Sequence, residues 1–211
     1  MKMIPRLALV LVACTGIGST CVAGDADGSM FGGLMTAQSL GQGRGTLGLS
    51  FGLADNNAIS GWFGYGMSKY VNGRVHLGFW DAGPKTFMAL GGDFVWQFWS
   101  VNEGPRYPID MAVGGFIEYE DKDGGSFLQL GSHLVGSYPF KLYKRGVLSP
   151  YGRLNVRLHR EAIEPNSSNS DIKFGLNGGA AWDATNALRF YGEFQIDGND
   201  GVFFGVEFDV M

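Results

Sequence analysis

The feature that most constrains this sequence is an alternation of apolar and polar side chains with a period of two. From residue 44 onward, apolar residues recur at every second position in segments separated by short polar runs. Successive side chains of a β-strand point to opposite faces, whereas one face of a helix repeats about every 3.6 residues. The alternation therefore predicts an all-β chain.

The polar runs between the segments consist of residues that favour tight turns. Examples are Asp55-Asn56-Asn57, Asn72-Gly73 and Asp123-Gly124-Gly125, which supply the backbone conformations that short hairpins need. The expected strands cover residues 44–54, 58–67, 74–80, 86–99, 109–120, 126–138, 148–160, 171–183, 187–197 and 201–211. This meander predicts an antiparallel up-and-down sheet, and ten strands, with eight as the alternative, can close it into a barrel.

Charged side chains fall on one face of the expected strands. In each of five strands the charges share one parity, except for Arg160 at the end of 148–160. The opposite faces of the last three strands carry no charge, which random placement would rarely produce. If the apolar face of the barrel points outward, eight of these charges line its lumen: Asp110, Glu118, Arg153, Arg157, Lys173, Arg189, Glu193 and Glu207.

Alternation alone fits both a soluble barrel with an apolar interior and a membrane barrel with an apolar exterior. Large aromatic residues such as Trp96, Trp99 and Trp182 gather at strand ends, where a bilayer interface selects them. Most expected strands are long enough to cross a bilayer at a tilt, and glycines on the charged face leave room in a narrow lumen. We therefore predict an antiparallel up-and-down transmembrane β-barrel.

The first 24 residues have the pattern of a secretory signal peptide. Basic residues precede a short apolar run, and small residues lead to an expected cleavage site after Ala23 or Gly24. Cleavage there removes both cysteines, so the mature chain forms no disulfide. A lipobox-like run ending at Cys14 makes acylation of that cysteine the alternative. We expect a signal peptide at 1–24, an N-terminal extension at 25–43, which is a partial strand, a plug or a periplasmic extension, and one barrel domain at 44–211.

Residues 44–211 resemble the small bacterial outer-membrane β-barrel proteins. Phe204, Val206, Phe208 and Val210 keep the alternation of the terminal strand that the barrel-insertion machinery reads in that superfamily, although the chain stops at Met211 and not at an aromatic residue. The resemblance implies a porin-like fold in the outer membrane of a Gram-negative bacterium. It also implies outer-membrane lipid, and the insertion machinery during biogenesis, as partners.

The charge pattern points to a structural lumen more than to a selective pore. Both signs face inward, which favours a paired network over the single-sign ring of a cation or anion channel. The lumen of ten strands is tight. We expect a monomer without enzymatic activity, serving as a structural or surface-interaction protein or as a narrow passage for small solutes.

Several other chemistries have no support in the sequence. Sixteen basic residues against twenty acidic ones give a net charge of −4, so no basic field is available to bind nucleic acid. Residues 121–124 begin like a calcium loop but lack its glutamate. Residues 41–45 are rich in glycine but lack the Gly-Lys-Ser/Thr ending of a phosphate loop. We therefore expect no cofactor and no metal.

Two alternatives from other classes make distinct structural predictions. A membrane-embedded lipid-modifying hydrolase needs a serine within hydrogen-bond reach of a histidine near one rim, and His159 is the candidate. A soluble or acylated periplasmic barrel that binds an apolar ligand needs its apolar residues inside. In that second case Leu49, Phe51, Phe204 and Val206 point inward.

Overall fold

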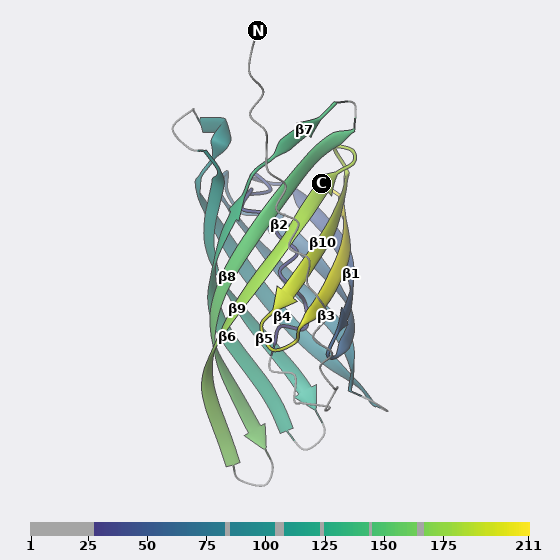
Figure 1. Ribbon diagram of the computed structural model, residues 1–211, viewed down its shortest axis with the longest axis vertical. Helices are drawn as coiled ribbons and strands as arrows, with labels where there is room; N and C mark the ends of the chain where they lie inside the picture. The colour runs from purple at the N-terminus through teal and green to yellow at the C-terminus, as the bar shows by residue number, and fades with distance from the viewer. Residues whose placement is uncertain (1–27, 83–84, 104–107, 123–124, 144, 164–166) are drawn as a thin grey trace, which may run out of the picture.

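The chain forms a closed antiparallel barrel of ten strands (Figure 1). The computed structural model describes residues 28–82, 85–103, 108–122, 125–143, 145–163 and 167–211. The barrel strands are β1 (Gly45–Ala54), β2 (Asn57–Gly66), β3 (Val71–Ala82), β4 (Lys85–Trp99), β5 (Asp110–Lys122), β6 (Gly125–Ser137), β8 (Gly146–Ile163), β9 (Ser167–Asp183), β10 (Leu188–Ile196) and β11 (Gly201–Asp209). The joints contain a short strand, β7 (Phe140–Leu142), and a short 3-10 helix, η1 (Val101–Glu103).

Two pairings close the sheet into a barrel. The last strand pairs with the first, in a register that joins Thr46 to Asp209. On the other side β6 pairs with β8, while β7 pairs only with β8 and lies above the barrel wall (Figure 1). Every barrel strand therefore has two hydrogen-bonded neighbours, and the expected ten-stranded up-and-down barrel is confirmed. Within the described residues, no helix is long and apolar enough to cross a membrane.

The strands differ in length, so one rim of the barrel is uneven. Strands β8 and β9 have 18 and 17 residues, whereas β10 and β11 have nine each. The long pair extends as a hairpin beyond its neighbours (Figure 1). The sequence predicted shorter strands here, 148–160 and 171–183, because Arg160-Glu161 and the polar run at 167–170 interrupt the alternation. In these added residues the backbone pairing between β8 and β9 continues, although apolar and polar side chains no longer alternate.

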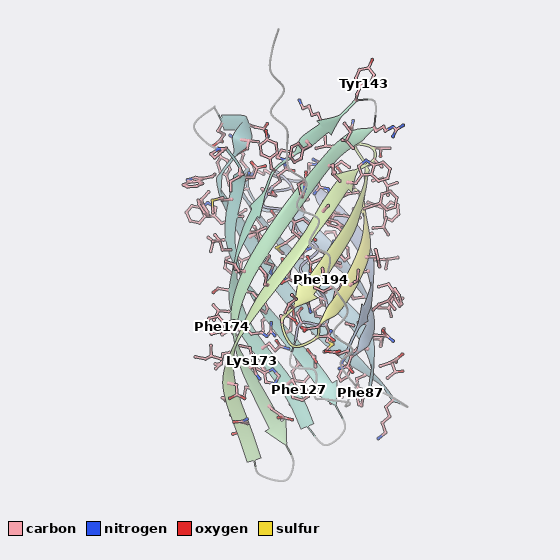
Figure 2. The ribbon with its side chains drawn as sticks, viewed as in Figure 1. Phe87, Phe127, Tyr143, Lys173, Phe174 and Phe194 are labelled. Carbon is pink, nitrogen blue, oxygen red and sulfur yellow. The ribbon has the colours of Figure 1, made fainter. Side chains whose placement is uncertain are left out.

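The apolar residues of the strands face outward. Phe174 is 77% exposed, and Phe194 and Phe208 are also exposed. Figure 2 shows side chains projecting outward along the whole wall. Leu49, Phe51 and Phe204 are 59%, 47% and 51% exposed, which contradicts the soluble barrel with an apolar interior. Val206, the fourth residue of that alternative, is half-buried.

The interior of the barrel is filled by the chain's own N-terminal residues. We call residues 28–40 the plug. Ser29 at one end of the plug contacts Asn199 in the turn between β10 and β11, and Gln38 at the other end contacts Asp110 at the start of β5. The plug therefore passes from one rim to the other. Of the three structures that the sequence left open for residues 25–43, the described part, from residue 28 onward, forms a plug.

The hydrophobic core lies between the plug and the wall, in three clusters. Leu34 packs with Trp62, Tyr151, Tyr191 and Phe203. Met30 and Phe31 pack with Ala58, Trp80 and Ala89, and Met35 and Ala37 pack with Val95, Ala112 and Val135. Each cluster joins plug residues to strand residues, so burial of apolar surface holds the plug in place.

Candidate functional site in the barrel lumen

Most of the eight charges expected in the lumen are buried. Asp110, Glu118, Arg153, Arg157, Glu193 and Glu207 are each at most 5% exposed, while Lys173 and Arg189 are half-buried. They come from β5, β8, β9, β10 and β11. The structure therefore gathers side chains of both signs from half of the barrel wall around the plug.

Glu193 on β10 binds the backbone of the plug. Its two carboxylate oxygens accept hydrogen bonds from the backbone N–H groups of Gly33, at 2.5 Å, and Leu34, at 2.7 Å. The same carboxylate accepts from the hydroxyl of Tyr151 at 2.7 Å and the amide of Asn177 at 2.8 Å. Four donors satisfy this buried carboxylate, which would otherwise be costly to bury.

Arg74 on β3 binds the same two plug residues from the carbonyl side. Its guanidinium donates to the backbone oxygen of Leu34 at 3.0 Å and to that of Gly33 at 3.1 Å. Asp93 on β4 holds the guanidinium through an ion pair of 2.7 Å, and a ring nitrogen of His76 lies 2.8 Å from the same carboxylate. We call Arg74 and Glu193 the backbone clamp.

Glu193 is among the charges expected in the lumen, whereas Arg74 and Asp93 are not. Arg74 and His76 alternate with apolar residues in the expected strand 74–80, so the same alternation places Arg74 on the inner face. A sequence pattern also cannot show that a charged side chain binds a backbone segment and not another side chain.

Polar side chains hold both ends of the plug. At the end near the β10–β11 turn, the hydroxyl of Ser29 donates to Glu118 at 2.7 Å, and Gln195 donates to the backbone oxygen of Ser29 at 2.8 Å. At the other end, Asp110 accepts from the side-chain amide of Gln38 at 3.1 Å. Glu118, Asp110 and Glu193 thus all act as acceptors for the plug.

One buried ion pair closes the lumen near the β10–β11 turn. Arg157 on β8 lies 3.0 Å from Asp197 in the turn, and both side chains are almost completely buried. Asp197 lies outside the strands, and burial raises the pKa of its carboxyl above the ordinary value although Arg157 opposes this shift. The pair joins the turn to β8, which is separated from β10 by β9 alone.

Two small cavities lie beside the plug. A cavity lined by Met35, Arg74 and Tyr191, among others, measures about 20 Å³, and one lined by Phe31, Asp93 and others measures about 10 Å³. Holding one water requires a cavity of about 10–15 Å³ on this measure. Each of these two spaces therefore has room for a single water.

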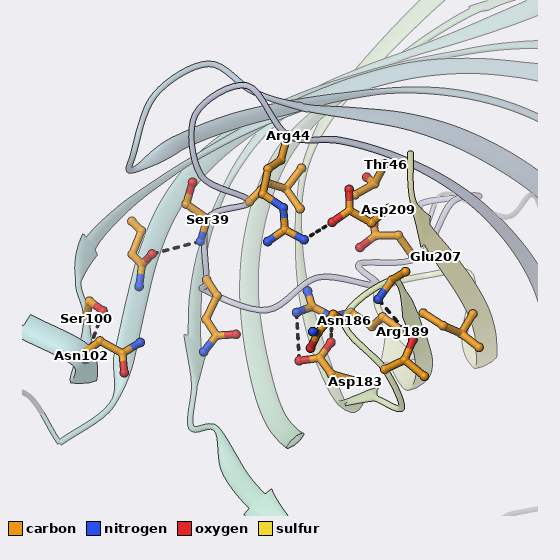
Figure 3. A pocket seen from close by; sticks show the side chains of 16 residues that line it. Ser39, Arg44, Thr46, Ser100, Asn102, Asp183, Asn186, Arg189, Glu207 and Asp209 are labelled. Carbon is orange, nitrogen blue, oxygen red and sulfur yellow. Dashed lines mark hydrogen bonds and ion pairs between the residues drawn. The ribbon is translucent and has the colours of Figure 1, made fainter. Parts of the chain in front are cut away.

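A polar vestibule opens at the rim that carries the ends of β1 and β11 (Figure 3). Its volume is about 290 Å³, and the plug residues Gln38, Ser39 and Leu40 form part of its lining. Ion pairs between Arg189 and Asp183 and between Arg44 and Asp209 lie along it. The vestibule is therefore bounded by the plug and by charges that pair with one another.

His159, the candidate histidine of the hydrolase alternative, is buried and packs against the ring of Phe127, with ring centroids 5.1 Å apart. Across the strands it is in register with Gln129 and Asp171, neither of which is a serine. The described register therefore gives the hydrolase alternative no support. In the part of the chain that the structure describes, no group of three or more acidic, histidine or cysteine side chains is placed to hold a metal ion.

Comparison with known proteins assigns the chain to no family. No family model matches the sequence, and no curated protein matches it. Among solved structures, the N-terminal β-barrel domain of Pseudomonas aeruginosa OprF is similar at a TM-score of 0.40, with 10% identity over 81% of this chain and 99% of that one. KdgM porin has a TM-score of 0.39, with 8% identity over 79% and 99% of the two chains. A structure from the de novo design of transmembrane β-barrels has a TM-score of 0.37, with 16% identity over 82% and 100%. Because these TM-scores are low, the barrel fold is assigned from the strand pairing of this chain and not from the similarities.

Proposed function

We propose that this protein is an integral outer-membrane β-barrel with a structural or surface-interaction role, kept closed by its own N-terminal segment. The observation that carries the proposal is the backbone clamp, in which Glu193 and Arg74 bind the N–H and C=O groups of the same two plug residues. A plug that is held by its backbone from two sides is a fixed part of the folded barrel. The proposal includes no catalytic step.

The outer surface supports a membrane location. A nine-residue strand such as β10 is about 30 Å long and, at a tilt of about 40°, covers roughly 23 Å, which matches the apolar band of a membrane barrel. Closure pairs each of the ten barrel strands with a neighbour on both sides, as hydrocarbon requires for the part of the wall that it surrounds. An exported chain with these properties belongs in the outer membrane of a Gram-negative bacterium, inserted by the barrel-insertion machinery and surrounded by lipid as a monomer. The expected signal peptide at 1–24 and Cys14 lie outside the described residues.

The filled lumen supports a barrel that does not conduct. Steady ion flow needs a continuous polar path through the protein, whereas the spaces beside the plug hold single waters. Several inward charges pair with an opposite charge or bind the plug, as in the ion pair between Arg157 and Asp197 and the hydrogen bonds of Glu193 to Gly33 and Leu34.

A narrow passage for small solutes is the second candidate. It is favoured by the vestibule of about 290 Å³, which is a polar entrance at one rim. Passage through the lumen would require the plug to leave the backbone clamp. The two candidates therefore differ in whether the plug stays in place in the membrane.

Planar-bilayer conductance of the refolded full chain tests the proposal. We expect insertion without steady current steps. Frequent, uniform steps in the wild-type chain would favour the solute passage and overturn the closed barrel. Insertion is scored separately, by protection of the barrel from added protease, so that silence caused by failed insertion is recognised.

A further inference from the structure

The polar vestibule at the rim that carries the ends of β1 and β11 is large enough for a small organic molecule. Its volume is about 290 Å³, close to the lower end of the range for ligand pockets, which is about 300–1,000 Å³. The plug residues Gln38, Ser39 and Leu40 form part of its lining, so a molecule held there contacts the last residues of the plug. A purely structural barrel does not require a chamber of this size.

The charged side chains of the vestibule lining already have partners. Arg44 pairs with Asp209, and Arg189 pairs with Asp183 (Figure 3). Glu207 is the remaining charged residue of the described lining, and its two oxygens accept hydrogen bonds from an indole and a phenol of the inner wall. A charged ligand would have to separate these pairs or stay without a counter-charge. The lining therefore favours an uncharged ligand.

Two buried oxygens in and beside the vestibule have no hydrogen-bond partner within the described part of the chain. Thr46 on β1 lines the vestibule and is 3% exposed, and its hydroxyl is one of them. The side-chain oxygen of Asn72 on β3 is the other, and Asn72 lines the cavity of about 20 Å³. That cavity shares Gln38 and Glu207 with the vestibule lining, so the two spaces adjoin. Because a buried oxygen without a partner is unfavourable, these positions favour a ligand with hydroxyl groups, which reaches Asn72 through a water.

Other lining residues supply amide groups and small apolar surfaces. Asn102 in η1 and Asn186 in the joint between β9 and β10 carry side-chain amides, each able to donate and to accept hydrogen bonds. Figure 3 shows Asn102 and Thr46 at opposite sides of the space. Leu40 of the plug and Leu188 at the start of β10 add apolar surface. A sugar ring has the matching chemistry, because its hydroxyl groups donate and accept while its C–H faces are apolar.

We propose that the vestibule binds a neutral, hydroxyl-rich molecule of the size of a monosaccharide. Hydroxyl groups of the sugar form hydrogen bonds with Thr46 and with the amides of Asn102 and Asn186, and the ring lies against the end of the plug. Because plug residues line the site, a bound sugar stabilises the plugged state according to its affinity and concentration. This inference rests on the proposed closed barrel, and it adds a binding site and a ligand class to it.

Saturation-transfer difference NMR tests the site with four sugars of similar size. The full chain is refolded into micelles of a phosphocholine detergent, which contains no sugar. The probes are glucose and galactose, which are neutral, and glucuronate and glucosamine, which are an anion and a cation in mildly acidic buffer. We expect at least one neutral sugar to bind, with an affinity several-fold higher than that of either charged sugar.

Two variants remove single hydrogen-bonding groups from the vestibule. T46V deletes the unpartnered hydroxyl and keeps the shape of the side chain, so it should weaken binding of the neutral sugar roughly fivefold, the value of one hydrogen bond. N186A removes an exposed amide of the lining and should weaken binding similarly, which keeps the test valid if T46V folds poorly. The matched control is T86V, because Thr86 lies at the other rim and donates to Asp81. It should bind the sugar as wild type does.

The outcomes separate this inference from the proposed closed barrel. Absence of binding by both neutral sugars, equal or tighter binding of a charged sugar, or unchanged binding in both T46V and N186A would overturn the sugar site. A bound neutral sugar should also slow hydrogen exchange of the peptide that contains residues 38–40. Steady conductance of wild type contradicts the closed barrel, whereas a silent barrel that binds no sugar contradicts this inference alone.

Discussion

Arg74 and Glu193 hold one short stretch of backbone between them. Glu193 accepts from the N–H groups of Gly33 and Leu34, and Arg74 donates to the carbonyl oxygens of the same two residues. Leu34 has a φ of 36°, in the left-handed region that non-glycine residues seldom adopt. The clamp therefore binds a specific backbone conformation as well as a specific position in the plug.

Replacing Glu193 by Gln should loosen the plug. Glutamine keeps one acceptor oxygen but replaces the other with an NH₂ group. This NH₂ group faces N–H and O–H donors that the second carboxylate oxygen had accepted from in wild type. Leaving buried N–H groups unsatisfied costs about 1–3 kcal/mol. We expect E193Q to unfold at lower denaturant concentration than wild type and to show intermittent current in planar bilayers.

The control for this variant is Glu103→Gln. Glu103 lies in η1 at the rim and forms an exposed ion pair with Lys69 at 3.0 Å. Such pairs contribute little in water, so E103Q should match wild type in both measurements. Equal behaviour of E193Q and wild type would contradict the role of the clamp.

Gly33→Ala tests the fit of the plug without changing charge. A Cβ at this position would lie 2.7 Å from an oxygen of Glu193 and 2.9 Å from a nitrogen of Arg153. The clamp must open to admit the methyl group, so we expect G33A to make the plug sensitive to protease in the inserted barrel. Protection equal to that of wild type would show that the clamp tolerates the shift.

Phe203 and Phe204 are neighbours on opposite faces of β11. Phe203 is 0% exposed and packs in the cluster that contains Leu34, whereas Phe204 faces outward. Truncating a buried phenylalanine costs about 3–5 kcal/mol in soluble cores. F203A should lower the unfolding midpoint strongly and F204A only slightly. The opposite order would contradict the assignment of the two faces.

A charge placed at the middle of the outer face should impair insertion. Leu154 is exposed on β8 and is in register with Leu134 and Leu176. Arginine on the lipid face near the midplane costs about 2–4 kcal/mol. We expect L154R to fold slowly or incompletely into vesicles, as measured by the fraction protected from protease. Ser170→Arg, in the part of β9 beyond the apolar alternation, should insert like wild type; equal insertion of L154R would place this face away from lipid.

Asp197 should give the barrel a defined response to acid. Burial raises its folded pKa, so the folded state binds the proton more tightly than the unfolded chain. The Asp197 carboxyl stabilises the folded state at pH values below the ordinary pKa of aspartate. This stabilisation declines as the pH rises from the ordinary pKa to the raised pKa of the folded state. The unfolding free energy of wild type relative to D197N should therefore fall with rising pH across this acidic interval and stay level above it. A rise across the same interval would contradict the assignment.

The barrel could be predicted from the sequence because the two faces of each strand meet different surroundings, which produces an alternation of apolar and polar residues. All ten expected barrel strands are present in the described residues, most within a few residues of the expected bounds, and the short strand β7 is additional. The ends of β8 and β9 were missed because Arg160-Glu161 and the polar run at 167–170 break the alternation. Pairing there depends on backbone hydrogen bonds, which have no side-chain signature.

The plug could not be derived from the sequence for a related reason. Residues 30–35, Met-Phe-Gly-Gly-Leu-Met, have no periodicity, and their place in the lumen depends on contacts with residues far along the chain. Glu193 lies 160 positions from Gly33. Local pattern identifies a charged inner face but cannot say which segment that face binds.

Hydrogen exchange of the plug amides in the lipid-inserted full chain tests the central claim most directly, because it needs no substitution. The N–H groups of Gly33 and Leu34 donate to Glu193 inside a filled lumen, so their peptide should exchange as slowly as peptides from β10. Exchange as fast as that of the exposed joint at residues 185–187 would show that the lumen is not closed by this segment.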